Sequence, residues 1–194
     1  IVDRISRLLW PFGIDPATVD RRLAFPLTEE DRAGGRHRVR PGDQRRMVFA
    51  VNISGSDATR MYPEDKMVAV ARHARSQFSG IETVILAAPS HREEQLRIAE
   101  ASGCRAIEPT PSFRAWAAVI DACDALLTPD TSTVHLAAAF GKPSVVLYVH
   151  DRPDLLPWYP YETPSWPVET TTNAIANIPI EDVQRAVNGC LETL

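Results

Sequence analysis

Cysteine is scarce in this sequence, and long apolar runs are lacking. Its three cysteines, Cys104, Cys123 and Cys190, are too few and too widely spaced for a disulfide framework or a metal site. We expect them to be small buried side chains in a reducing compartment. No run approaches the ~18 apolar residues of a membrane-spanning helix, and no signal peptide or lipidation motif is visible at the start. These absences predict a cytoplasmic protein.

Lysine is also scarce, because Lys66 and Lys142 are the only two. The net charge of −4 argues against a nucleic-acid partner. Nearly all positive charge is therefore arginine, and six arginines fall within residues 32–46. With glycines and a proline among them, they predict a solvated loop or linker. The alternative is a contact with anionic lipid headgroups or a phosphorylated acceptor, which arginine suits well.

Strand-like and helical patterns alternate from about residue 45 onward. Residues 1–14 predict a helix without a preceding cap, and an irregular polar segment follows it. Short apolar runs predict strands at 47–51, 83–87, 106–107, 125–128 and 144–149. Helical spacing predicts helices at 63–72, 90–101, 112–123, 132–140 and 180–191, with a proline-rich and aromatic segment at 153–167 before the last one. This alternation predicts an α/β fold, in which a Rossmann-like parallel sheet carries helices on both faces.

The segment most informative about function runs through residues 126–143. It passes from a strand, through a turn at Pro129-Asp130, into a helix that Gly141 and Pro143 end. The helix thus begins at the carboxyl end of a parallel strand, where ligands of open α/β sheets usually bind.

The first turn of that helix has the composition of an anion site. Thr131, Ser132 and Thr133 would offer hydroxyl groups beside the free N–H groups and positive dipole end of the helix, and His135 would add a further donor. The structural alternative is that Asp130 or Thr131 serves only as the N-cap and that His135 is an ordinary first-turn histidine.

Two enzyme classes do not fit these residues. Asp130, Ser132 and His135 lie too close together on one turn for the relay of a hydrolase triad, and no Gly-x-Ser-x-Gly elbow is present. A dinucleotide oxidoreductase would need a Gly-x-Gly-x-x-Gly motif after a strand, which is also absent.

Several motifs together resemble one enzyme family. Residues 130–137 (Asp-Thr-Ser-Thr-Val-His-Leu-Ala), then Gly-Lys-Pro at 141–143 and an apolar strand, resemble the motif of the ADP-heptose:lipopolysaccharide heptosyltransferases, glycosyltransferase family 9. Residues 54–64 resemble the family's small-residue loop, basic residue and aromatic-Pro-Glu helix start, and residues 158–160 resemble its Trp-x-Pro. The resemblance covers residues 45–190. It departs from the family at Ser132, where many members have glycine, and at Val149-His150, where glycine is common.

The resemblance implies the C-terminal, donor-binding half of a GT-B fold, which consists of two Rossmann-like domains. Residues 1–40 would be an interdomain helix and linker from a missing N-terminal domain, and residues 41–194 would be the nucleotide-sugar-binding domain. The implied partners are an ADP-linked nucleotide-sugar, a glycolipid or glycan acceptor and the missing domain. Peripheral contact with the cytoplasmic face of the inner membrane is a further expectation.

The implied reaction is the inverting transfer of a heptose from ADP-heptose to a lipopolysaccharide core or a related glycan. A fixed cation and a helix N-terminus stabilise the leaving diphosphate, so no metal or other cofactor is implied. The residues implied in donor binding are Thr131, Ser132, Thr133 and His135 on the diphosphate, Arg60 as the basic residue beside it, Asp130 on sugar hydroxyls, Glu93 on ribose hydroxyls, and Ser54 and Ser56 along the phosphate site.

Each of the additional residues also has a purely structural explanation. Arg60 could be a surface arginine near a helix start, Ser54 and Ser56 could be turn formers, and Glu93 has capping-box spacing from Ser90. The carboxylate that removes the acceptor's proton lies in the N-terminal domain of the family, and no residue here matches it. We therefore expect this chain to bind the donor and to transfer nothing alone. The alternative is a nucleotide-sugar-binding module or pseudoenzyme.

Overall fold

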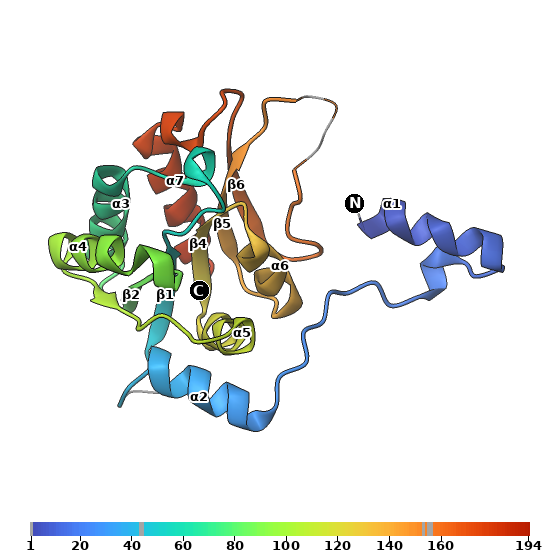
Figure 1. Ribbon diagram of the computed structural model, residues 1–194, viewed down its shortest axis with the longest axis horizontal. Coiled ribbons are helices and arrows are strands. Elements are labelled where there is room, and N and C mark those ends of the chain that lie inside the picture. Colours follow the sequence, from blue (N-terminus) through green and yellow to red (C-terminus); the bar gives the residue numbers. More distant parts are fainter. Residues whose placement is uncertain (1, 43–44, 153, 155–156) are drawn as a thin grey trace.

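A parallel β-sheet forms the centre of the molecule. The computed structural model describes residues 2–42, 45–152, 154 and 157–194. Within these ranges six strands pair in the order β3-β2-β1-β4-β5-β6, and every pair is parallel (Figure 1). The strands are β1 (Met47–Asn52), β2 (Ile81–Leu86), β3 (Arg105–Ala106), β4 (Ala125–Pro129), β5 (Ser144–Val149) and β6 (Ser165–Thr170). The predicted α/β class with a parallel sheet is confirmed.

Helices cover both faces of the sheet, because successive strand residues point to opposite sides. Phe49 and Val51 of β1 join the apolar cluster beneath α3 (Glu64–Gln77), α4 (Arg92–Ser102) and α7 (Ile180–Leu191). Val48 and Ala50 of the same strand join a second cluster with α5 (Phe113–Ala122) and α6 (Ser132–Ala139). The near-continuous apolar character of the strands follows from this burial on both faces.

The order of the strands reverses between β1 and β4. Val51 of β1 pairs with Ile85 of β2 on one side and with Leu127 of β4 on the other. From β1 the chain moves outward to β2 and β3, and it then returns to the other side for β4, β5 and β6. The loops that follow β1 and β4 therefore diverge, and such a switch point leaves a crevice at the carboxyl ends of the strands.

The loop predicted at residues 32–46 is wrong for residues 32–39, which belong to a helix, α2 (Glu29–Val39), and residues 43 and 44 lie outside the described residues. Thr28 Oγ1 accepts a hydrogen bond from the Asp31 amide at 3.1 Å, and the Asp31 carboxylate accepts one from the Thr28 amide at 2.9 Å. This capping box, with acidic residues in the first turn and basic ones in the last, complements the helix dipole. α2 packs on α5, so this helix lies against the sheet-covering helices.

Two further local predictions need correction. The proline-rich segment continues into β6, which lies at the edge of the sheet and contains Pro167; an edge strand tolerates a residue without an amide N–H. Ser90 and Glu93 do not form a capping box, because α4 has His91 as its N-cap and no side chain caps it. A 3-10 turn (Pro89–His91) leads into that helix instead.

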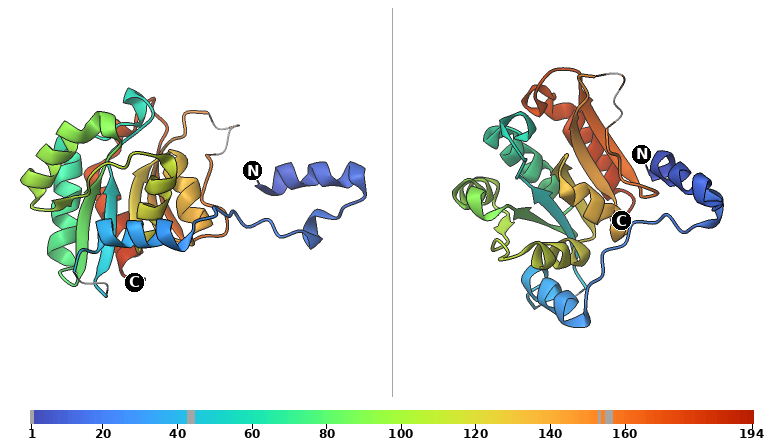
Figure 2. Two further views of the ribbon diagram at one scale, coloured as in Figure 1. Left: turned by 60° about the horizontal axis from the view of Figure 1, so that its bottom comes forward. Right: turned by 45° about the vertical axis from the view of Figure 1, so that its right-hand side comes forward.

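Residues 2–24 form an arm that lies apart from the sheet (Figures 1 and 2), whereas Phe25 and Leu27 pack on the second apolar cluster. The arm contains α1 (Val2–Ser6) and a 3-10 helix (Arg7–Phe12), which ends at Gly13 with a φ of 72°. The helix predicted to end near Gly13 is thus confirmed from residue 2 onward, and Ile1 lies outside the described residues. Large apolar side chains on the arm are exposed: Ile5, Leu8, Trp10, Phe12, Ile14 and Val19. Among the described residues, no helix has the length and apolar character to cross a membrane.

The contact between α2 and α5 predicts opposite effects on stability for substitutions at Gly35 and Gly34. A Cβ on Gly35 would lie 2.1 Å from the Ala118 carbonyl oxygen of α5, whereas a Cβ on Gly34 would meet nothing within 4 Å. We expect Gly35→Ala to reduce the free energy of unfolding by about 1–3 kcal/mol through overpacking. Gly34→Ala should raise it by about 0.5–1 kcal/mol, because alanine favours the helix. Urea denaturation measures both, and equal shifts for the two variants would contradict the close packing.

Candidate functional site

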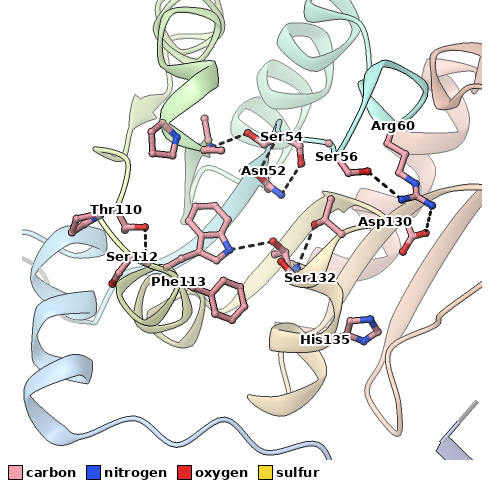
Figure 3. A pocket seen from close by; sticks show the side chains of 18 of the residues that line it. Asn52, Ser54, Ser56, Arg60, Thr110, Ser112, Phe113, Asp130, Ser132 and His135 are labelled. Carbon is pink, nitrogen blue, oxygen red and sulfur yellow. Dashed lines mark hydrogen bonds and ion pairs between the residues drawn. The ribbon is translucent and has the colours of Figure 1, made fainter.

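A cavity of about 840 Å³ opens at the carboxyl ends of the strands, where the strand order reverses (Figure 3). Four connections contribute to it, one after each of β1, β2, β3 and β4, together with Trp158. The cavity-lining segments are Asn52 and residues 54–56 with Arg60, residues 87–89, residues 110–113 with Trp116, and residues 130–133 with His135. The crevice expected from the topology is therefore a real hollow with polar side chains in it.

Eight of the nine residues predicted for the site line this cavity. They are Ser54, Ser56, Arg60, Asp130, Thr131, Ser132, Thr133 and His135. Glu93 is the exception, because it lies exposed in the first turn of α4 and is not among the lining residues.

Arg60 and Asp130 face each other across the opening between the β1 and β4 loops. The Arg60 Nη2 atom lies 3.6 Å from Asp130 Oδ2, and Nη1 donates to Ser56 Oγ at 3.1 Å. Burial raises the pKa of the Asp130 carboxyl, and the nearby Arg60 and His135 oppose this rise. A guanidinium has five N–H donors, so Arg60 keeps capacity for an anion while it makes both contacts.

The loop that carries Arg60 is folded tightly back on itself. A Cβ on Gly55 would lie 2.0 Å from the Arg60 carbonyl oxygen, so this close approach requires glycine. Asp57 caps the 3-10 turn Ala58–Arg60 by accepting from the Thr59 amide at 2.9 Å. The backbone around Arg60 is therefore fixed by short-range contacts.

The start of α6 brings three hydroxyl-bearing residues to the cavity. Thr131 is the N-cap: its Oγ1 accepts from the Thr133 amide at 3.3 Å, and its carbonyl accepts from the Val134 amide at 3.0 Å. Within the described part of the chain, the Ser132 amide and the amide of the N-cap residue Thr131 have no partner. Fewer backbone donors are thus available to an anion than the sequence suggested, and the hydroxyl groups matter more.

A buried polar network beneath the cavity joins the strand ends. Asn52 Nδ2 donates to Thr128 Oγ1 at 3.0 Å, which links β1 to β4. Ser54 Oγ accepts from the Ala88 amide at 2.8 Å and lies 3.1 Å from His91 Nδ1, which links the loops after β1 and β2. Sequence reasoning missed Asn52 and Thr128, although a polar residue at the end of an otherwise apolar strand was the available signal.

The opposite wall is apolar and aromatic. Pro89, Pro111, Phe113 and Trp116 line it, and the Phe113 side chain is half exposed. Trp158 packs edge-on against His135, with 5.7 Å between ring centroids. Phe113 and Trp116 were also missed, because an aromatic residue in the first turn of a helix has no functional signature in sequence. A cation, a helix N-terminus and hydroxyl groups facing a flat apolar wall suit a ligand with a phosphate at one end and a ring at the other.

The site contains no arrangement typical of a metal centre. Among the described residues, no group of three or more His, Cys, Asp or Glu side chains is placed to hold a metal ion. The three cysteines are all buried and unpaired, as the sequence predicted, and burial raises the pKa of each thiol.

Comparisons with known proteins give a family match and similar folds. The family model for glycosyltransferase family 9 (heptosyltransferase) matches residues 2–187, and no curated protein matches the chain. The fold is similar to a family 9 glycosyl transferase from Veillonella parvula DSM 2008, with a TM-score of 0.76 and 20% identity over 92% of this chain and 57% of that one. It is also similar to E. coli ADP-heptose lps heptosyltransferase II, with a TM-score of 0.68 and 19% identity over 88% and 54% of the two chains.

A third structure, E. coli heptosyltransferase WaaC with ADP-2-deoxy-2-fluoro heptose, has a TM-score of 0.59 and 21% identity over 84% of this chain and 50% of that one. The chain thus spans about half the length of these structures. At such low identity the likeness establishes the fold.

The partly buried carboxylate of Asp130 leads to a prediction about stability. Because the pKa of Asp130 is higher in the folded than in the unfolded state, its ionisation at neutral pH destabilises the fold. Asp130→Asn should therefore raise the melting temperature at pH 7. The gain should shrink as the pH falls through the raised pKa of the folded state, and it should vanish below about 4, where Asp130 is protonated in both states.

Asp57→Asn is the matched control with the opposite sign. Hydrogen bonds from Thr59 and Ser56 lower the pKa of Asp57, so its charge stabilises the fold above the pKa of the unfolded state. This variant should melt at a lower temperature at pH 7, with the loss disappearing in acid. A lower melting temperature for Asp130→Asn at pH 7 would contradict the assignment of Asp130 as a destabilising site residue.

Proposed function

This chain belongs to glycosyltransferase family 9, and from that membership we propose that its cavity binds the nucleotide-sugar donor of a glycosyl transfer. The observation that carries the proposal is the pairing of a cationic, hydroxyl-rich wall with an apolar wall at the switch point of the sheet. A nucleotide-sugar has the matching parts: a flat base, a doubly charged diphosphate and a polyhydroxyl ring.

The diphosphate lies between Arg60 and the first turn of α6 in this proposal. Arg60 supplies a fixed positive charge, and the Ser132 amide and the hydroxyls of Thr131, Ser132 and Thr133 supply donors. His135, held edge-on by Trp158, adds a ring N–H on the same side. Ser56 bonds to Arg60, while Ser54 ties two loops together, so these two serines shape the phosphate site.

In this proposal the apolar wall holds the nucleotide base, and Asp130 faces the sugar. Pro89, Pro111 and Phe113 offer flat apolar surface to an adenine ring. The structures of E. coli heptosyltransferase WaaC were determined with ADP and with ADP-2-deoxy-2-fluoro heptose, which supports an ADP-linked heptose as the donor. A carboxylate is unfavourable next to a phosphate, so Asp130 accepts hydrogen bonds from sugar hydroxyls while Arg60 lies between it and the diphosphate.

The proposed reaction is an inverting displacement. An acceptor hydroxyl attacks the anomeric carbon, and the bond from that carbon to the diphosphate oxygen breaks. Arg60 and the α6 N-terminus stabilise the negative charge that grows on the leaving diphosphate without any metal. The acceptor is a lipopolysaccharide core or a related glycan at the cytoplasmic face of the inner membrane, and a carboxylate outside this chain removes its proton.

The exposed apolar side chains of the arm are evidence for a second domain, which would supply that carboxylate. Its side chains include Trp10 and Phe12, which is 79% exposed, and large exposed apolar groups of this kind mark an interaction surface. In the proposal the arm packs on the N-terminal half of a two-domain transferase.

A nucleotide-sugar-binding module without transfer is the second candidate. One observation favours it: among the described lining residues Asp130 is the single carboxylate, and Arg60 pairs with it. Incubation of the chain with ADP-heptose and a lipopolysaccharide-core acceptor tests the two candidates. We expect donor binding with no gain of acceptor mass for this chain alone, and a gain of one heptose when an N-terminal half is supplied. No gain in either case would favour the binding module.

Substitution of Arg60 tests donor binding directly. We expect Arg60→Ala to weaken ADP binding about 10- to 100-fold, because a charge-assisted contact to phosphate is lost. Isothermal titration calorimetry measures this affinity. Arg185→Ala, which removes an equally charged surface residue from α7, is the control and should leave it unchanged. Equal affinities for both variants and the parent would place the diphosphate elsewhere.

A further inference from the structure

A hydrogen bond joins the two walls of the cavity at its base. Trp116 of α5 donates its indole N–H to Thr133 Oγ1 of α6 at 3.2 Å. Thr133 is 2% exposed, while Trp116 is partly buried, and both line the cavity. The bond therefore connects the aromatic wall to the anion-binding turn.

The chemistry of the two groups fixes the direction of this bond. An indole nitrogen only donates, so Thr133 Oγ1 is the acceptor and its own proton must point to another atom. A threonine hydroxyl in a helix commonly donates to the carbonyl four residues earlier. That carbonyl, of Pro129, here accepts from Thr128 Oγ1 at 2.9 Å. Within the described chain no atom accepts the Thr133 proton.

We propose that Trp116 is a positioning residue, which holds the Thr133 hydroxyl as a fixed donor to a phosphate oxygen of the bound nucleoside diphosphate. This inference rests on the proposed function. With the indole N–H on one lone pair, the hydroxyl proton turns toward the cavity before the ligand arrives. The chain of donors from indole through hydroxyl to phosphate polarises each bond in the same direction, which strengthens the last one.

An oriented Thr133 hydroxyl would compensate for the small number of free amides at this turn. The Thr133 amide is occupied by Thr131 Oγ1, so Thr133 contributes through its side chain. Ser132 and Thr133 then present one amide and one oriented hydroxyl on the same side of the helix start. Orientation before binding removes the cost of ordering the hydroxyl when the ligand binds.

The test compares the affinities for ADP and adenosine, measured by calorimetry, because their ratio isolates the contribution of the diphosphate. Thr133→Val keeps the shape but removes the hydroxyl, and the ratio should fall about 10-fold or more. Thr133→Ser keeps the hydroxyl, and the ratio should stay near the parent value. Trp116→Phe keeps an aromatic ring but removes the N–H, and the ratio should fall about 3- to 10-fold. Trp10→Phe makes the same change on the arm and should alter nothing.

The double variant distinguishes positioning from packing. If Trp116 acts through the Thr133 hydroxyl, then Trp116→Phe has no further effect on the ratio in the Thr133→Val background. Effects that multiply, or a ratio that Trp116→Phe leaves unchanged, would overturn the inference while the proposed function stands. A parent chain that binds ADP no better than adenosine would overturn the proposed function itself, and this inference with it. Thermal melting of each variant shows whether the fold is retained.

Discussion

The hydrogen bond between Asn52 and Thr128 holds together the two strands on which the cavity depends. It joins β1 to β4 at 3.0 Å, at the place where their following loops turn in opposite directions. The backbone pairing of β1 with β4 ends at Val51 and Leu127, so the side chains of the next residues join the two strand ends. A buried amide and a buried hydroxyl must find partners, and here they find each other across that point. Arg60, which follows β1, and Asp130, which follows β4, are thereby kept within 3.6 Å.

The site is assembled from groups that the fold alone would not favour. The Asp130 carboxyl is partly buried and its pKa is raised. Its contact with Arg60 is longer than a hydrogen bond, so neither group is fully satisfied by the other. The Thr133 proton and the Ser132 amide add unused donors nearby. Polar groups whose hydrogen-bonding capacity is unused reduce the stability of a folded protein. They are retained where a bound ligand satisfies that capacity.

The sequence predicted most of the α/β framework because strong periodicity reports burial. The last helix was placed at its observed bounds, Ile180–Leu191, and β5 was placed likewise. The α2 helix was missed because two glycines and many arginines outweighed the capping residues at Thr28 and Asp31, a signal that the sequence does contain. The β6 strand was missed because Pro167 suits a strand only at an edge, and sheet position is not local information.

Eight of the predicted residues line the cavity, whereas its aromatic wall was not predicted, and this difference has a physical reason. The first turn of α6 follows β4, and Arg60 lies in the loop that follows β1, so strand ends and turn composition place these residues. The aromatic wall is fixed by tertiary packing instead: Phe113 packs edge-on against Phe25, at 5.7 Å between ring centroids, and Arg114 donates to Asp31 at 2.9 Å. No pattern within the local sequence of α5 shows which helix will cover it.

The arginine-rich segment supports that aromatic wall through contacts between α2 and α5. Arg32 of α2 pairs with Asp121 at the end of α5, and Gly35 lets the backbone of α2 touch Ala118. These contacts hold α5 in place, and with it Trp116 at the base of the cavity. Arg36 and Arg40 pair with carboxylates of the chain itself, so at least three of the six arginines are engaged in the fold. Their charge is thereby compensated, and the segment has less to offer an anionic lipid surface than its composition suggests.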